Sequence, residues 1–213
     1  MKTKLWPAAV LCLLCGSNRA HAGPIHSGTF ALGAERITGV FHADEKTDPG
    51  GTAGNTAFAL FGNSEDSPLA GAWQLPRIGF DVFVASGLSL GGSFVVLDRS
   101  RSGNDATDII FAPRVGFGYM FGRVVGIWPR GGMSYWHESG SGNAEAHSFA
   151  FDLDVPLLFA PAHNFAITLG PLLDVGFAGD VSGGVDVGAV RVGGSSDTSF
   201  VQYGLSAGIV ALL

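Results

Sequence analysis

The chain has 213 residues, which is enough for one domain of ordinary size. Only 14% of its residues are charged, against an average of about 25% in soluble domains. Its formal net charge of −6 argues against nucleic acid as a partner. Beyond the first 22 residues, no apolar stretch approaches the roughly 20 residues that a membrane-spanning helix needs.

The first 22 residues have the features of a secretory signal peptide. Lys2 and Lys4 give a basic start, an apolar run follows over residues 8–14, and Ala20-His21-Ala22 places small residues where a signal peptidase cleaves. We therefore expect residues 1–22 to be removed during export, which leaves a single domain of residues 23–213.

Removal of this segment changes the chemistry of the chain. Both cysteines leave with it, so the mature chain has no thiol or disulfide, and nine basic residues remain against 18 acidic ones, a formal charge of −9. A lipoprotein anchored at Cys12 or Cys15 is the alternative, although neither cysteine follows a small residue. Because lipid-exposed backbone must satisfy its own hydrogen bonds, an exported chain of this composition indicates a closed β-barrel.

Apolar and polar residues alternate along almost all of the mature chain. In residues 148–159, for example, Phe149 and Phe151 lie on one face of a strand, and Asp152 and Asp154 lie on the other. The pattern predicts eight strands, at about 29–42, 77–85, 88–97, 109–121, 124–136, 148–159, 165–177 and 199–213.

Several strands contain irregular positions. In the first strand, Phe30 and Leu32 have one parity and Ile37 and Phe41 the other, which predicts a bulge near Glu35-Arg36. Because proline cannot donate a hydrogen bond to a strand ladder, we expect further bulges at the four strand prolines, at a shared height. These are Pro113, Pro129, Pro156 and Pro171.

Tight and long connections alternate strictly between the expected strands. The tight connections are 86–87, 122–123 and 161–164, and the long ones are 43–76, 98–108, 137–147 and 178–198. This asymmetry is typical of outer-membrane barrels, which have short periplasmic turns and longer external loops. We interpret the apolar segment 56–62 as loop structure or a strand extension above the membrane. Aromatic residues near both sets of connections indicate two membrane interfaces.

The sequence resembles the small eight-stranded outer-membrane barrels, the OmpX-like and OmpA-like β-barrel domains. The resemblance rests on Arg77-Ile78-Gly79-Phe80-Asp81, on the hairpin at 87–92 and on the alternating strand 199–213, although those barrels commonly end in Phe and this chain ends in Leu213. It implies an all-β, eight-stranded, antiparallel up-and-down transmembrane β-barrel in the outer membrane. The implied partners are outer-membrane lipid and lipopolysaccharide, and the barrel-assembly machinery through the C-terminal strand, with no identified extracellular partner.

Charged residues recur on the polar face of the strands. An eight-stranded barrel is just wide enough for side chains to fill it, and buried charges are tolerated when they are paired. We therefore expect a structural ion-pair network inside the barrel, with Arg114 and Arg130 each paired to an aspartate; a proton or ion path is the alternative. The expected members are Arg77, Asp81, Arg114, Arg130, Asp152, Asp154 and Asp174, with Glu35 or Arg36.

Polar residues of the external connections offer few candidates for chemistry. His137, Glu138, Glu145 and His147, with Ser139 and Ser141 nearby, could form a metal or hydrolase site, but their spacing matches no motif. The acidic loops around Asp44, Glu45 and Asp48, and around Asp180, Asp186 and Asp197, could hold Ca²⁺ but match no calcium-binding pattern. We expect no catalytic residue, no metal and no cofactor.

These expectations favour a non-enzymatic outer-membrane barrel with a structural or surface-interaction role carried by its external loops. Three alternatives remain open. They are a rim-active enzyme that modifies lipid A or cleaves proteins, a narrow channel, and a soluble lipocalin-like barrel that binds a lipophilic ligand. Alternation alone does not say which face of the strands points outward.

Overall fold

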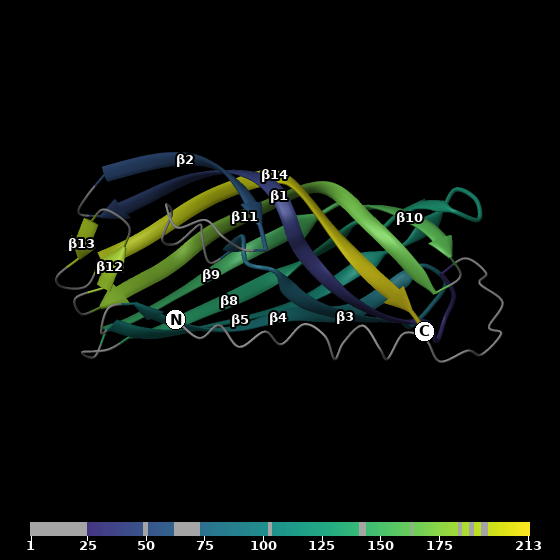
Figure 1. Cartoon of the computed structure of the whole chain (residues 1–213), viewed down its shortest axis with the longest axis horizontal. Helices are drawn as coiled ribbons and strands as arrows, with labels where there is room; N and C mark the ends of the chain where they lie inside the picture. The colour runs from purple at the N-terminus through teal and green to yellow at the C-terminus, as the bar shows by residue number, and fades with distance from the viewer. Residues whose placement is uncertain are drawn as a thin grey trace.

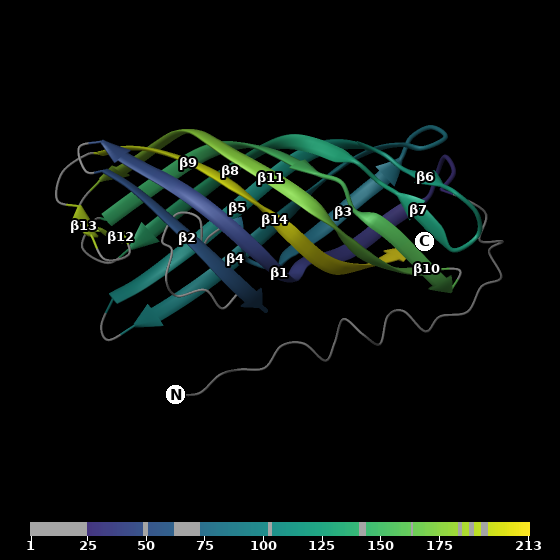
Figure 2. The same cartoon turned by 90° about the horizontal axis from the view of Figure 1, so that it is seen from above.

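The computed structural model describes residues 25–48, 51–61, 73–101, 104–140, 144–162, 164–182, 185–187, 190–192 and 196–213. The expected signal peptide, Ser141 and His163 lie outside these residues. The described chain is almost entirely β-strand and forms one elongated barrel (Figures 1 and 2). Within the described ranges, no helix is long and apolar enough to cross a membrane.

Eight strand positions form the barrel wall, and β14 closes it by pairing antiparallel with both β1 and β11. Three positions are divided into two strands, because β5 continues as β6, β7 as β8, and β9 as β10. The strands are β1 (Phe30–Asp48), β2 (Gly51–Leu60), β3 (Arg77–Phe83), β4 (Leu88–Arg101), β5 (Asn104–Phe117), β6 (Tyr119–Met120), β7 (Val125–Ile127), β8 (Arg130–Gly140), β9 (Ala144–Asp154), β10 (Leu157–Ala162), β11 (Phe165–Ser182), β12 (Val185–Val187), β13 (Val190–Val192) and β14 (Ser196–Leu212). The eight-stranded antiparallel fold predicted from the sequence is confirmed.

The predicted bulge in β1 is present between Ala34 and Thr38. Ala34 pairs with Ile209 and Thr38 pairs with Ala207, so β1 has two more residues than β14 across this interval. Because side chains alternate with a period of two, an insertion of two residues leaves the parity unchanged. Phe41 therefore points into the barrel and is fully buried, on the face opposite to Leu32.

The bulges expected at the four prolines are absent. The register of β5 with β8 is the same on both sides of Pro113, where Phe111 pairs with Tyr135 and Arg114 with Gly132. Each of the other three prolines still accepts a backbone hydrogen bond through its carbonyl oxygen, at 2.9 Å; they are Pro129, Pro156 and Pro171. Each proline therefore removes one N–H donor from the hydrogen-bond ladder but does not shift the register of the neighbouring strands.

The two ends of the barrel differ, and we call them the turn end and the hairpin end. At the turn end the connections are tight, as predicted: Gly87 has a φ of +81°, and the Val84 amide donates to the Leu88 carbonyl over 2.9 Å. At the hairpin end, however, two of the predicted long loops are mostly strand, since β4 and β5 leave only 102–103 between them, and β8 and β9 only 141–143. Continued cross-strand pairing satisfies the hydrogen-bonding groups of the backbone in these extensions as well as in the membrane-spanning part of the strands.

The segment around 56–62 belongs largely to a strand. β2 pairs with Thr38–Thr47 of β1, above the stretch Phe30–Glu35 that pairs with β3. The two strands thus lie one above the other along the same flank of β1, and the alternation of connections is preserved (Figure 2). Within the described residues, β2 pairs with β1 alone.

The apolar face of the strands points outward. Leu90, Phe117, Leu153 and Leu169 are between 38% and 54% exposed on the outer wall, whereas Asp81 and Asp174 are buried inside. A wall that is apolar outside and polar inside is the arrangement of a transmembrane barrel, because its outer surface faces hydrocarbon.

Three layers of side chains fill the barrel along its axis. At the turn end, Ile25, Phe83, Trp128 and Leu158 belong to one apolar cluster. At the hairpin end, a second apolar cluster is built from Trp73, Val95, Ile110, Trp136 and Phe200. Charged residues occupy the interior between the two clusters.

We predict that Leu169→Arg destabilises the folded barrel by about 2–4 kcal/mol, because Leu169 lies on the lipid-facing wall and a charge at the bilayer midplane must leave water. The measurement is equilibrium unfolding in urea from lipid vesicles. Thr52→Arg, at an exposed position of β2 at the hairpin end, is the matched control. An equal loss of stability in both variants would contradict the assignment of the outer wall to lipid.

Candidate functional site

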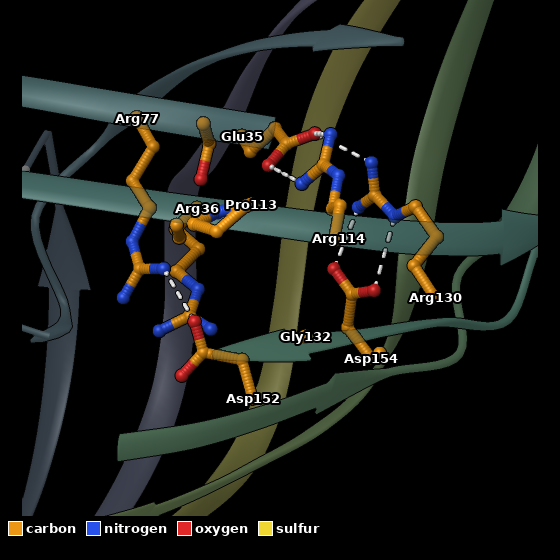
Figure 3. Close-up of a pocket in the computed structure, with 12 residues that line it drawn as sticks. Glu35, Arg36, Arg77, Pro113, Arg114, Arg130, Gly132, Asp152 and Asp154 are labelled. Carbon is orange, nitrogen blue, oxygen red and sulfur yellow. Dashed lines mark hydrogen bonds and ion pairs between the residues drawn. The ribbon is translucent and has the colours of Figure 1, made fainter. Parts of the chain in front are cut away.

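Nine charged side chains gather in the middle layer of the barrel, and we call them the interior network; Figure 3 labels all of them except Asp81 and Asp174. They comprise four guanidinium groups and five carboxylates contributed by six strand positions. The members are Glu35, Arg36, Arg77, Asp81, Arg114, Arg130, Asp152, Asp154 and Asp174. All seven residues predicted from the sequence are present, and β1 contributes both Glu35 and Arg36 where one of them was expected.

Glu35 links Arg114 and Arg130 in the first half of the network. Its carboxylate accepts two hydrogen bonds from Arg114, both at 2.6 Å, and one from Arg130 at 2.5 Å. Arg114 also donates to Asp81, and Arg130 donates to Asp154 at 3.0 and 2.6 Å. Both arginines are therefore paired with an aspartate, as predicted. Bonds between ionised partners in two-pronged geometry are the strongest hydrogen bonds that proteins make.

Arg36 forms the second half of the network. It donates to both carboxylate oxygens of Asp174, at 2.7 and 2.8 Å, and to the backbone carbonyl of Trp73 at 2.6 Å. Asp174 is fully buried and accepts a further hydrogen bond from Gln202 at 3.0 Å. Both oxygens of this buried carboxylate therefore accept hydrogen bonds from donors within the barrel.

The backbone of Arg36 allows two consecutive residues to point inward. Arg36 has a φ of +53°, in the left-handed region that residues other than glycine rarely adopt. Such a conformation costs on the order of 1–3 kcal/mol. It places Glu35 and Arg36 on the same side of β1, and the ion pairs that both residues form offset the strain.

Arg77 and Asp152 complete the network. The guanidinium of Arg77 donates to Asp152 at 3.1 Å and lies over the ring of Trp73, 5.5 Å from its centroid. Ser134 donates to the other oxygen of Asp152 at 2.8 Å. Arg130 likewise lies 4.6 Å over the ring of Trp128, so both ends of the network rest on the aromatic rings of the adjoining apolar layers.

Glycines make room for these side chains. A Cβ atom at Gly79 would lie 2.4 Å from the Glu35 carboxylate, and one at Gly116 would lie 2.8 Å from Cγ of Arg130. Because these positions carry no side chain, the charged residues pack closely and leave a cavity of only about 20 Å³ among them. That volume is sufficient for about one water molecule.

Among the residues that the structure describes, the histidines of β8 and β9 do not assemble with a serine. His137 stacks on Tyr135, with ring centroids 6.4 Å apart and planes 8° apart, and it lies directly opposite His147. Ser139 lies opposite Glu145 on the same pair of strands. Across the ranges that the structure describes, no three metal-binding side chains are gathered closely enough to hold an ion. The side chain of Asp186 falls outside what the structure describes.

A row of three polar side chains in contact, which the sequence did not indicate, lies on the outer face of β1 and β2. The Thr56 hydroxyl is 2.7 Å from His42 Nδ1, and His42 Nε2 is 3.5 Å from Asp44. The side chains of His42 and Asp44 are 32% and 54% exposed. Segment 56–62 was expected as loop structure or a strand extension with no assigned partner, so only the pairing of β2 with β1 reveals the contact of Thr56 with His42. The apolar alternation around Phe58 was the one available signal for this strand.

Comparison with solved structures finds the same fold at low sequence identity. The outer-membrane protein AlkL, determined in lipid bilayers, matches with a TM-score of 0.50 and 14% identity over 93% of this chain and 96% of its own. Neisserial surface protein A matches with a TM-score of 0.48 and 13% identity, over 87% and 99% of the two chains. OprG from Pseudomonas aeruginosa matches with a TM-score of 0.46 and 9% identity, over 89% and 98%. No protein-family model and no curated protein sequence matches the chain.

We predict that Glu35→Gln destabilises the barrel by about 3–5 kcal/mol, because the neutral amide leaves the guanidinium groups of Arg114 and Arg130 buried with one carboxylate fewer. Urea unfolding of the barrel in vesicles measures the change. Asp44→Asn is the control, since Asp44 is exposed on the outer face and its substitution should alter stability by less than about 1 kcal/mol. A Glu35→Gln barrel as stable as the control would show that the network is not needed for stability.

Proposed function

We propose that the protein is a sealed barrel of the Gram-negative outer membrane that acts through its external surface rather than by conducting solutes. The interior network carries this proposal, because its nine charged residues leave a cavity of about 20 Å³. A pore for hydrated ions needs a continuous opening several times larger. The apolar clusters at both ends of the lumen support a closed interior.

The lipid-facing surface supports a location in the outer membrane. Exposed aromatic residues form two girdles, one near the turns with Tyr119, Phe121 and Phe159, and one near the hairpins with Phe111, Tyr135, Phe149 and Phe177. Aromatic rings at two levels are typical of a barrel that crosses a bilayer, because their amphipathic edges suit the headgroup regions. In this membrane, lipopolysaccharide and other lipid would contact the wall, and β14 would be the strand that the barrel-assembly machinery engages.

The hairpin end supports a surface-interaction role. Strands β1, β4, β5, β8, β9, β11 and β14 continue at this end beyond the segments that the sequence assigned to the membrane. They form a stiff extension of the barrel, which Figure 1 shows at the end opposite the C-terminus. Rigid strands lose less conformational entropy on binding than free loops do, so such an extension suits recognition of an external partner.

A non-enzymatic role is part of this proposal. Thr56, His42 and Asp44 resemble a nucleophile, a base and an orienting acid, but the carboxylate is more than half exposed and lies 3.5 Å from the imidazole. Catalysis of this kind needs an oriented base in a water-excluded site with donors for the developing oxyanion. The chain of contacts lies instead on the exposed outer face of two strands.

Single-channel recording in planar bilayers tests the seal. We expect the purified barrel to insert without producing steady ion conductance, because the network blocks the lumen. The double variant Glu35→Ala/Arg130→Ala shortens two facing side chains and is expected to conduct more than the native barrel. Steady open-pore currents from the native protein would rule out the proposal and favour a channel.

Mass spectrometry of lipid A tests the non-enzymatic role. Cells that produce the native barrel, its His42→Ala variant or no barrel are expected to contain lipid A of the same composition. Release of acyl chains by the native protein, lost in His42→Ala while the variant still shows the heat-dependent gel shift of a folded barrel, would establish an enzyme.

A further inference from the structure

Two histidines on neighbouring strands lie directly opposite each other at the hairpin end. His137 of β8 pairs with His147 of β9, and His147 pairs on its other side with Asp180 of β11. Tyr135 and Phe149 precede and follow these histidines by two residues and are exposed on the outer wall, so the histidines face outward as well. Directly opposed residues of antiparallel strands have Cβ atoms about 4.5–5.5 Å apart.

This spacing matches the requirements of a bound transition metal. Two imidazole nitrogens on one tetrahedral Zn²⁺ lie about 3.3 Å apart, given a Zn–N bond of about 2.0–2.1 Å. Imidazoles whose Cβ atoms are 4.5–5.5 Å apart can lean together to this separation by rotation about their side-chain bonds. Imidazole is a preferred ligand of Zn²⁺, Ni²⁺ and Cu²⁺, whereas Mg²⁺ and Ca²⁺ require oxygen ligands throughout.

The surroundings provide a third ligand and space for the ion. His147 and Asp180 line a hollow of about 500 Å³ on the outer face, with Lys46, Phe149 and Phe177 also in its lining, whereas His137 lies outside that lining. The carboxylate of Asp180 lies one strand from His147 and can complete a set of two nitrogens and one oxygen, with water in the remaining position. His137 currently stacks on Tyr135, so metal binding requires its ring to turn away from Tyr135 toward His147.

We infer that His137, His147 and Asp180 form a surface site for a divalent transition-metal ion. The site is completed when the ion binds, since the three groups are not already gathered around one point. Because His137 gives up its stacking contact, we expect affinity on the order of micromolar rather than that of a preformed structural zinc site. The inference is independent of the proposed seal of the lumen.

Isothermal titration of the folded full-length barrel in detergent with ZnCl₂ tests the site. The native protein is expected to bind about one Zn²⁺ per chain and to give no heat with MgCl₂. His137→Asn and His147→Asn are each expected to weaken Zn²⁺ binding by at least about tenfold, and Asp180→Asn by less. His42→Asn is the matched control, because His42 is another partly exposed histidine on the outer face beside an aspartate, and it is expected to leave binding unchanged.

Three results would overturn the inference. They are no Zn²⁺ binding by the native protein at millimolar metal, native affinity in both His137→Asn and His147→Asn, or a loss in His42→Asn as large as theirs. Native affinity in Asp180→Asn would remove Asp180 from the ligand set. If a histidine variant fails to fold, protection of the native protein from diethyl pyrocarbonate is measured instead. Zn²⁺ should then shield His137 and His147 but not His42, and equal shielding of all three contradicts the site.

Discussion

Ion pairing between the bulge of β1 and the strands across the lumen is the interaction on which the interior depends. Closure of eight strands leaves an interior just wide enough for side chains, so every charge that points inward loses most of its water. Arg114 and Arg130 require more than one carboxylate between them, and Asp174 requires a cation. Glu35 and Arg36 meet these needs from consecutive positions of one strand, which is possible only because Arg36 adopts a left-handed backbone conformation.

The same interaction constrains the register of the wall. Glu35 connects β1 to β5 and β8, and Arg36 connects it to β11, so the network ties together strands that are not neighbours in the sheet. A shift of β1 by one residue would place these charges on the lipid face and apolar side chains in the network. The cost of both errors in a medium without water makes the observed register far more favourable than its neighbours.

The inner and outer faces of the barrel wall thus differ in polarity. The charged groups of the interior network are paired with one another on the inner face, and this leaves little room for a solute. The outer face presents apolar side chains to lipid over most of its height and changes to histidine, aspartate and hydroxyl groups toward the hairpin end. Chemistry that involves external molecules is therefore concentrated where the strands emerge from the membrane, and this is where His137 and His147 lie opposite each other.

The sequence by itself determined the number of strands, the faces of most of them, the tight turns and seven of the nine charged residues of the network. These features depend on local alternation and on the rule that inward charges in a narrow barrel must be paired. Tertiary structure decided the rest. Whether the bulge at Glu35-Arg36 inserts one residue or two depends on the register with β14, and proline in a strand is harmless only if the neighbouring strands stay aligned. The pairing of β2 with β1, and with it the contact of Thr56 with His42, arises between segments whose own patterns do not specify a partner. Alternation records which residues share a face, but the identity of the opposing residue is set by cross-strand hydrogen bonds, which local sequence does not encode.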